Sequence, residues 1–472
     1  MPLSFFNTLT GKVTPFTSLI PGVATMYSCG PTVYDHAHIG NMRPYVHADL
    51  VKRALEHNDY KVKHTINITD FGHLVGDGDS GEDKMMLALR REGRPITKEA
   101  MREMTQFYTA SFTSDLSAMN TRPNVTYTPA SEYITEEIAL VKTLQEKGYT
   151  YETSDGVYFD ISKFPTYGKL GNINLEKLRS GARVEVNAEK HHPADFVVWK
   201  KGELGWESPW GMGFPGWHIE CTAMVFATLG EQIDIHTGGE DLMATHHNGE
   251  IAQAETATGT APYVGYWMHN AFITIENSKI SKSLGNTILL SGLTERGYSP
   301  LDLRFWFLNG HYRTTMNFTF EALDGARQAL SRLRRHLYEE YGAEAGGTIS
   351  KTHATLFWNA VHDDLNTPVA LATLWNLIDD KTVSAEDKVA TIQSFDALLG
   401  LGLTETREAG MHALGILSLD NVPNDIQKLI ADREVARTEK RWNDADTLRQ
   451  DIVQKGYLVE DTPEGIKITR NT

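Results

Sequence analysis

The sequence has few cysteines, no long apolar run and no surplus of positive charge. Only Cys29 and Cys221 among 472 residues carry a thiol, so a disulfide framework is excluded and each cysteine needs its own explanation. No apolar run approaches the roughly 18 residues that span a bilayer. The first residues, MPLSFFNTLTGKV, do not have the basic and apolar regions of a secretory signal. We therefore expect a cytoplasmic protein with no membrane partner.

The formal net charge is −16, which argues against a protein that coats nucleic acid non-specifically and against a DNA partner. An RNA partner remains possible, because a local basic patch can lie on an acidic protein. Residues 327–335, with the sequence RQALSRLRR, are the candidate patch. The solvated face of an ordinary helix has the same composition, and both interpretations stay open.

Apolar periodicity predicts a nucleotide-binding α/β sheet at the start of the chain. Residues 24–28 form a predicted strand, a helix is expected to begin near residues 41–44, and residues 61–68 alternate as a second strand does. A right-handed crossover would make the two strands parallel. The rest of the pattern is helical over 84–148, mixed over 150–200, alternating between strand and helix over 232–283, helical from 319, linker-like over 401–423, and helical over 425–455 before a hairpin near 461–465.

Two short strings carry groups suited to phosphate chemistry. His36 and His38 can donate to phosphate oxygens, and Gly40 and Asn41 lie where a helix N-terminus favours anions. Either string alone is weak evidence for a phosphate site. The first, HIGN at 38–41, matches easily by chance, and the second, KISKS at 279–283, also fits a solvated loop.

The second string supplies Lys279 and Lys282, two cations for the charge that develops on a transferring phosphate. Taken in this order, with strand-like sequence between them, the two strings resemble the HIGH and KMSKS signatures of class I aminoacyl-tRNA synthetases.

The cysteines belong to a candidate metal set. Cys29 follows the first strand, Cys221 lies in GWHIEC, and His246 and Glu250 are four apart, which places them on one face of a helix. Two thiolates, an imidazole and a carboxylate suit zinc. The alternatives are that each cysteine is a small core residue and that His246 and Glu250 form an exposed pair.

The chain resembles cysteinyl-tRNA synthetases over nearly its whole length. The C-terminal string ARTEKRWNDADTLRQDIVQKGYLVEDTPEGIKI is similar to that family's last unit. The other matching stretches are CGPTVYDHAHIGNMRP, NITD, DFVVWK, WESPWGMGFPGWHIECTAM, IDIHTGGEDL, HHNGEIAQAE, YWMHN, KISKSLGN, FWFLNGHYR and DDLNTPVAL.

The resemblance implies a role for each matched position. One Zn²⁺ per chain at Cys29, Cys221, His246 and Glu250 would take the substrate thiolate directly. Catalytic positions would be His36, His38, Lys279 and Lys282; ATP-binding positions Gly40, Asn41, Gly238, Gly239, Asp241 and Lys282; substrate-binding positions Thr32, Thr69, Trp217 and His236; and anticodon-binding positions Arg437, Trp442 and Asp446.

The resemblance also implies the domain organisation. We expect an α/β protein with a Rossmann-type parallel sheet interrupted by an insertion, then an α-helical bundle and a small C-terminal α+β module. The expected boundaries are 1–115 for the first half of the catalytic domain, 116–195 for the insertion, 196–285 for the second half, 286–318 for a stem-contact region, 319–400 for the bundle, 401–423 for a linker and 424–472 for the anticodon-binding module.

The predicted activity is ligation of L-cysteine to tRNA(Cys) with ATP and Mg²⁺, by a monomer. One alternative is an ATP-dependent ligase that joins cysteine to an amino sugar, as in mycothiol synthesis. The other is a catalytically silent relative that only binds RNA or zinc. The anticodon-like tail argues against the first alternative, and the presence of His38, Lys279 and Lys282 argues against the second.

Departures from the family pattern remove no charged or metal-binding group. Asn41, Ile280 and Thr237 replace a histidine, a methionine and a glycine of the family strings, and Gly249 stands inside the HHNGE turn. Four protein ligands usually close a zinc site, so either the coordination expands to five or Glu250 is loosely held. The acidic run over residues 71–83 is longer than the common family form, and we interpret it as a solvated loop because EF-hand spacing is absent.

Overall fold

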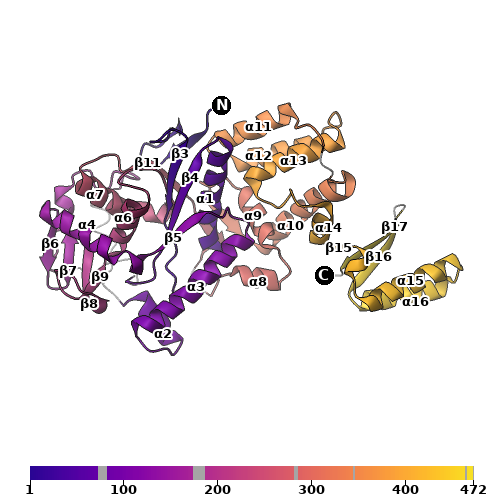
Figure 1. Ribbon diagram of the computed structural model, residues 1–472, viewed down its shortest axis with the longest axis horizontal. Coiled ribbons are helices and arrows are strands. Elements are labelled where there is room, and N and C mark those ends of the chain that lie inside the picture. The colour runs from indigo at the N-terminus through magenta and orange to yellow at the C-terminus, as the bar shows by residue number, and fades with distance from the viewer. Residues whose placement is uncertain (73–81, 174–186, 281–284, 344–345, 463–464, 471–472) are drawn as a thin grey trace.

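The structure is a computed structural model that describes residues 1–72, 82–173, 187–280, 285–343, 346–462 and 465–470 (Figure 1). The side chain of Trp217 also lies outside the described part. The candidate residue Lys282 and residues 73–81 of the acidic run lie outside the described residues.

A five-stranded parallel sheet forms the centre of the protein. Its spatial order is β11-β10-β3-β4-β5, and every neighbouring pair runs parallel. The strands are β3 (Val23–Ser28), β4 (Lys61–Ile68), β5 (Val125–Pro129), β10 (Ile233–Gly239) and β11 (Val264–Asn270). In sequence rank this order is 5-4-1-2-3, which reverses between β3 and β10. Ligands bind in such sheets beyond the carboxyl ends of the strands at the reversal.

Helix α1 (Ile39–His57) connects β3 to β4 and confirms the predicted βαβ unit. Its first turn is closed by a capping box. The His38 ring accepts from the Asn41 N–H, at 3.3 Å, while the Asn41 side chain accepts from the His38 N–H, at 3.1 Å. Asn41, where the family string has histidine, therefore stabilises the start of this helix.

The expectation of helix over 84–148 is wrong in one place. Helices α2 (Lys84–Arg91), α3 (Lys98–Ala118) and α4 (Ile134–Glu146) are present, but β5 lies between α3 and α4 and pairs with β4. Five residues ending in Pro129 are too few to show a strand period beside two long helical patterns. The outer strand of the parallel sheet thus lies within the range assigned to the insertion.

A second sheet, antiparallel and four-stranded, lies beside the first (Figure 1). It consists of β6 (Thr150–Thr153), β7 (Gly156–Phe159), β8 (Phe196–Trp206) and β9 (Gly213–Pro215). Helices α4, α6 (Trp217–Thr228) and α7 (Asn248–Thr258) contact one another beside it. The range 150–200, which the sequence pattern described as mixed, thus contains β6, β7 and the start of β8.

Beyond the parallel sheet the chain is mainly helical. Three short strands, β12 (Ile273–Ile275), β13 (Ser278–Lys279) and β14 (Met316–Phe318), form a small sheet. The helices are α8 (Leu290–Glu295), α9 (Pro300–Leu308), α10 (Phe320–Arg335), α11 (Lys351–His362), α12 (Thr367–Asp379) and α13 (Ala385–Leu399). The N-terminal hairpin of β1 (Ser4–Asn7) and β2 (Lys12–Pro15) contacts β11.

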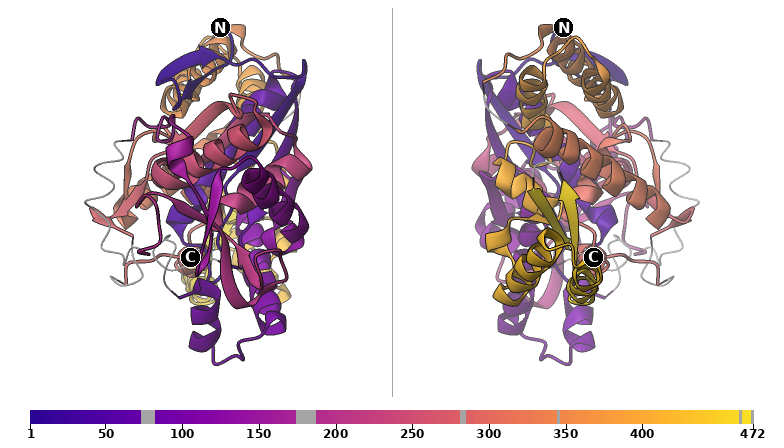
Figure 2. Two further views of the ribbon diagram at one scale, coloured as in Figure 1. Left: turned by 90° about the vertical axis from the view of Figure 1, so that its left-hand side faces the viewer. Right: turned by 90° about the vertical axis from the view of Figure 1, so that its right-hand side faces the viewer.

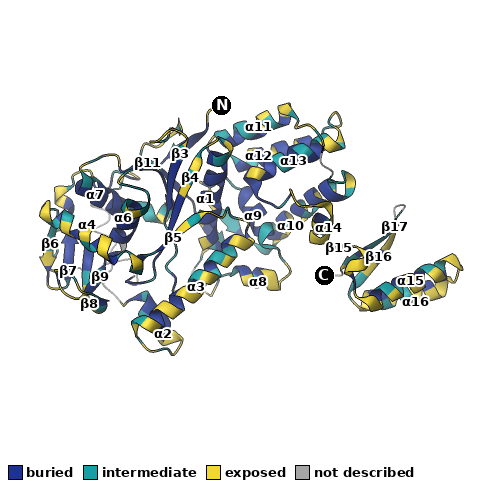
Figure 3. Cartoon of the chain, viewed as in Figure 1, coloured by how far each residue is buried: buried dark blue, intermediate teal, exposed yellow. Residues whose placement is uncertain are grey.

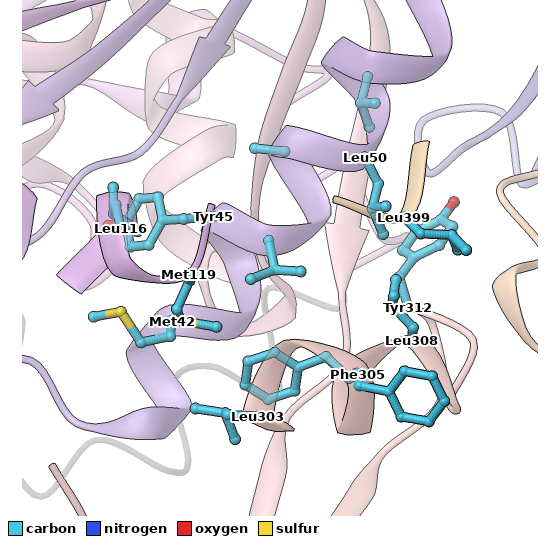
Figure 4. Packing of buried hydrophobic residues seen from close by; sticks show 14 of the residues in the cluster. Met42, Tyr45, Leu50, Leu116, Met119, Leu303, Phe305, Leu308, Tyr312 and Leu399 are labelled. Atoms are coloured by element: carbon cyan, nitrogen blue, oxygen red, sulfur yellow. The ribbon is translucent and has the colours of Figure 1, made fainter. Parts of the chain in front are cut away.

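One apolar core joins the sheet to these helices. Figure 4 shows side chains of α1, such as Met42 and Leu50, beside Leu303 and Phe305 of α9 and Leu399 of α13. A buried ion pair crosses the same junction, because Arg304 donates to the Asp49 carboxylate at 2.6 Å. Figure 3 colours most of β3, α1 and α9 as buried.

The predicted linker at 401–423 contains helix α14 (Arg407–Ala413) and strand β15 (Ile416–Leu417), which sequence pattern did not reveal. Gly410 lies on α14 so close to the Tyr338 ring that a Cβ would lie 2.4 Å from it. β15 pairs with β17 (Gly465–Arg470), and β17 pairs with β16 (Tyr457–Thr462). With α15 (Asn424–Thr438) and α16 (Trp442–Gln454) these strands form the C-terminal module, seen from its own side in Figure 2.

Candidate active site

A cleft of about 650 Å³ opens at the carboxyl ends of β3 and β10, where the strand order reverses. It brings together residues from distant parts of the sequence. The predicted site residues that line it are Cys29, Thr32, His36, His38, Gly40, Asn41, Cys221, Gly239, Asp241, His246 and Lys279. Four other predicted site residues do not line the cleft and are buried: Thr69, His236, Gly238 and Glu250.

The four proposed metal ligands converge at the bottom of this cleft. Cys29 follows β3, Cys221 lies on α6, His246 lies in a turn wound more loosely than an α-helix, and Glu250 lies in the first turn of α7. One donor atom from each lies within 4.8 Å of every other. His246 Nε2 is 3.1 Å from a Glu250 carboxylate oxygen, so the loose turn preserves the expected pairing. The donor set and its compactness fit a zinc ion.

Glu250 also belongs to a second, overlapping group. Its other carboxylate oxygen lies 3.0 Å from His236 Nε2. Cys29 Sγ lies 3.3 Å from His247 Nε2, so Cys29, His236, His247 and Glu250 form an alternative compact set. Glu250 is therefore positioned by contacts with two histidines.

The charges in this cluster favour anionic ligand atoms. Burial alone would raise the pKa of Cys221, yet a hydrogen bond from Cys29 and the charge of His246 lower that pKa to about 6. The pKa of Cys29 is raised, first by its position deep in the cleft and then by its hydrogen bond to Cys221. Burial would likewise raise the pKa of Glu250, but His236 and His246 lower it to about 2. One thiolate and one carboxylate are therefore present at neutral pH.

Further histidines line the back of the cluster, and sequence reasoning did not select them. His247 Nδ1 lies 2.7 Å from His269 Nε2, and His269 Nδ1 lies 2.8 Å from Thr8 Oγ1. Burial and neighbouring positive charge lower the pKa of His247, and burial lowers that of His269 to about 3, so both are neutral. His218 contacts His246, ring nitrogen to ring nitrogen, at 2.9 Å. The strings HHNGE, YWMHN and GWHIEC contained this signal.

The two strings proposed to bind phosphate lie next to each other beside the cleft. Ile39 N–H donates to the Ile288 carbonyl at 2.9 Å, just beyond the KISKS loop. A Cβ placed on Gly40 would lie 2.7 Å from Ile280 Cδ1 and 3.0 Å from the His38 ring. Gly40 is therefore needed for the close approach of the segment that carries Lys279.

His36 is fixed by helix α3 rather than by its own loop. Its Nδ1 lies 2.9 Å from Ser111 Oγ, and its ring packs edge-on against Tyr108, with ring centroids 5.1 Å apart. Tyr108 and Ser111 are three residues apart near the middle of α3, so they share one face of the helix, and Tyr108 also lines the cleft. The side chain is thus oriented toward the cleft by a rigid element.

At the end of β10, Gly238 and Gly239 allow side chains to pack closely. A Cβ on Gly238 would lie 2.7 Å from His247 Cε1, and one on Gly239 would collide with the Asp241 carboxylate. Gly239 and Asp241 line the cleft. Gly238 instead makes room for a histidine of the metal-ligand cluster.

Thr69 lies behind the cleft and belongs to a buried hydrogen-bond network. Its hydroxyl donates to Glu220 at 3.0 Å and accepts from Asn67 Nδ2 at 3.2 Å. Asn67 Oδ1 in turn accepts from the Gly30 N–H, at 2.6 Å. The network connects β4 to the turn that carries Cys29, and neither Asn67 nor Glu220 was selected from the sequence.

The proposed anticodon residues lie on the C-terminal module, away from the cleft. Trp442, the first residue of α16, is 58% exposed, whereas Ala445 and Ile452 of the same helix are buried. Trp442 therefore lies outside the buried face of this helix. Arg437 pairs with Asp461 at 2.6 Å, and Asp446 is exposed.

None of the helices in the described residues combines the length and apolar character required to cross a bilayer.

Comparisons with known proteins agree with this geometry. Residues 15–328 match the family described as the catalytic domain of class I (C) tRNA synthetases, and residues 419–468 match the cysteinyl-tRNA ligase anticodon binding domain. The cysteine–tRNA ligase 1 of Burkholderia lata is 44% identical, with 99% of this chain and 97% of that protein covered. The cysteine–tRNA ligase of Treponema denticola is 40% identical, with 98% of each covered.

Solved structures show the same fold at low identity. The methionyl-tRNA synthetase of Mycobacterium tuberculosis, in complex with methionyl-adenylate, has a TM-score of 0.57 at 12% identity over 85% of this chain and 94% of that chain. The LeuRS of Agrobacterium radiobacter K84, in a ternary complex with tRNA and LeuAMS, has a TM-score of 0.61 at 10% identity over 85% and 86%. The chain is a member of the cysteine–tRNA ligase family of class I aminoacyl-tRNA synthetases.

Proposed function

We propose that the chain activates L-cysteine with ATP and transfers the cysteinyl group to the 3′ end of tRNA(Cys). The observation that carries this proposal is the cleft itself. Its lining combines thiol and imidazole donors of the compact set with His38, Gly40 and Lys279. A substrate bound in this cleft can therefore present its side chain to soft ligands and its carboxylate to the segments proposed to bind phosphate.

One Zn²⁺ per chain would be held by Cys29, Cys221, His246 and Glu250, because their donor atoms suit zinc and lie close together. A bound zinc ion supplies a ligand position for a thiolate that the hydroxyl of serine does not fill equivalently. This matters because an apolar pocket discriminates such isosteres by only about 10². On the resemblance, Trp217, His236, Thr32 and Thr69 are assigned to substrate binding; of these, Thr32 lines the cleft, and His236 and Thr69 are buried.

The chemistry then needs positioning rather than a nucleophilic side chain. The cysteine carboxylate attacks the α-phosphate of ATP, which enters with Mg²⁺, and pyrophosphate leaves. Lys279 and Lys282, with His36 and His38, would stabilise the charge that develops on the phosphates. The proposed ATP-binding residues at this site are Gly40, Asn41, Gly238, Gly239 and Asp241. The terminal ribose hydroxyl of tRNA then takes the cysteinyl group and releases AMP.

The C-terminal module supports a tRNA acceptor over an amino sugar. Its match to an anticodon-binding domain and the exposed Trp442 have no use in a small-molecule ligase. Arg437, Trp442 and Asp446 are proposed to contact unpaired anticodon bases by stacking and hydrogen bonding. A monomer that works in the cytoplasm stays a prediction from the resemblance.

The test is the choice of acceptor. The purified protein, given ATP and labelled cysteine, should transfer the label to tRNA(Cys) and not to an amino sugar such as glucosaminyl-inositol. Transfer to the sugar alone would favour the ligase alternative. Absence of both transfers, with no cysteine-dependent pyrophosphate exchange, would favour the silent relative.

A further inference from the structure

A buried arginine in the first turns of helix α1 contacts the small sheet that carries Lys279. Arg43 is 3% exposed and does not line the cleft. None of the roles proposed above is assigned to it. Its two terminal nitrogens donate to four backbone carbonyls at 2.6–3.2 Å, those of Ala271, Phe272, His311 and Thr314.

These carbonyls belong to the segments that lead into two neighbouring strands. Ala271 and Phe272 directly precede β12, and Thr314 lies two residues before β14. The two strands pair in parallel, and the Met316 N–H donates to the Phe272 carbonyl at 3.2 Å, so all four acceptors lie at the same end of the small sheet. One guanidinium therefore connects the helix that begins at the HIGN string to the base of both strands.

The same contact continues one turn further along α1. The His47 ring stacks on the Tyr312 ring, with centroids 4.2 Å apart and planes 11° apart. Burial lowers the pKa of His47 to about 3, so this ring is neutral, whereas burial lowers the pKa of Arg43 only to about 10. Arg43 is thus a buried cation whose charge is stabilised by oriented carbonyl dipoles, and those carbonyls must stay in place for it to be stable.

A short hairpin transmits the position of this base to Lys279. β12 and β13 are joined by Glu276 and Asn277, whose φ angles of 49° and 61° are those of a tight two-residue hairpin turn. Asn317 of β14 accepts from the Asn277 N–H at 2.7 Å and from the Thr274 hydroxyl at 2.9 Å. Lys279 is the partner of Thr274 in the hairpin. Displacement of the base of the sheet therefore displaces Lys279 as well.

We propose that Arg43 is a positioning residue for adenylate formation: it fixes the base of the β12–β14 sheet on helix α1 and thereby sets where Lys279 meets the phosphates. The proposal rests on the function proposed above and adds a residue that acts on the reaction without touching the substrate. Lysine cannot replace Arg43, because one ammonium group does not reach both pairs of carbonyls that the planar guanidinium spans.

The test compares Arg43→Lys with Arg53→Lys in the full chain. Arg53 is a matched control, because it lies on the same helix, is 4% exposed and also donates to two carbonyls, those of Asn120 and Ala397, which lie outside the small sheet. Arg43→Lys should lower the kcat of cysteine-dependent pyrophosphate exchange by about 10- to 100-fold, with the KM for cysteine and the zinc content little changed. Arg53→Lys should lower thermal stability and leave kcat unchanged.

Combination with Lys279→Ala separates positioning from a general structural effect. If Arg43 acts through Lys279, Arg43→Lys should cost less than about threefold once Lys279 is alanine, whereas independent effects would multiply. Asn317→Ala releases the hairpin from β14 and leaves Arg43 in place, so it tests the same connection even if Arg43→Lys does not fold. It should show the same loss of kcat and the same non-additivity. A wild-type kcat in either single variant, or multiplied effects in the double variants, would overturn the proposal.

Hydrogen–deuterium exchange separates failure of this proposal from failure of the proposed function, because it needs no substrate. The amides of residues 273–279 should exchange faster in Arg43→Lys than in wild type, and at the wild-type rate in Arg53→Lys. An unchanged amide exchange rate over 273–279 in Arg43→Lys would overturn the positioning role by itself. A wild-type chain without pyrophosphate exchange would instead contradict the proposed function.

Discussion

Replacing Gly40 with alanine tests whether the two phosphate-binding strings must touch. The new Cβ would lie 2.7 Å from Ile280 Cδ1 and 3.0 Å from the His38 ring, well inside an ordinary contact. The closest atom, Ile280 Cδ1, is the end of a flexible side chain and can move aside, so the cost should lie near the lower end of the roughly 1–3 kcal/mol typical of overpacking. If that cost falls on the arrangement that brings Lys279 to the cleft, adenylate formation should slow by roughly fivefold, since 1.4 kcal/mol corresponds to a factor of ten.

The assay is cysteine-dependent pyrophosphate exchange, with zinc content and thermal unfolding as checks that the rest of the protein is intact. Gly292→Ala is the matched control, because Gly292 lies in α8 and a Cβ there meets no atom within 4 Å. Ile280→Ala combined with Gly40→Ala removes the closest contact and should restore most of the lost activity. Wild-type exchange in Gly40→Ala, or no recovery in the double variant, would refute the reasoning.

Three other predictions concern the metal, the lysine loop and the tail. Purified protein should contain about one zinc ion per chain, as a four-ligand site implies, and Cys29→Ser or Cys221→Ser should lose it in metal analysis; a zinc content unaffected by either change would exclude the site. Lys279→Ala should slow pyrophosphate exchange by about 10²–10³ with little change in the KM for cysteine, and the opposite pattern would contradict its role. A chain ending at Gly415, before β15, should keep exchange activity and lose efficient charging of tRNA. Trp442→Ala should weaken tRNA binding by about 1–3 kcal/mol, and full charging by either variant would contradict the assignment of the module to anticodon binding.

Sequence pattern predicted the elements whose signal is local. Alternation over 61–68 and the apolar stripe of α1 gave the βαβ unit, and the parallel pairing of β3 with β4 confirms it. β5 and β15 were missed because short strands acquire their identity from a partner far along the chain. β5 needs β4, and β15 needs β17, which is about 50 residues away.

The residues of the site were predicted largely through motif resemblance, but their contacts with one another were not predicted. Spacing placed His246 and Glu250 on one face, but nothing in the sequence indicated that Glu250 would also pair with His236. The alternative ligand His247 and the supporting residue Glu220 are adjacent to selected residues and were overlooked for lack of a spatial reason. Such roles depend on how α6, α7 and β10 pack together, which periodicity does not reveal.

The central claim is that the chain selects cysteine through a thiol-specific site joined to an adenylate-forming cleft. Pyrophosphate exchange measured side by side with cysteine and with serine tests it most directly. The account predicts rapid exchange with cysteine and a kcat/KM for serine lower by far more than the roughly 10² that an apolar pocket provides. Exchange with serine within that factor of cysteine, or no exchange with cysteine at all, would contradict it.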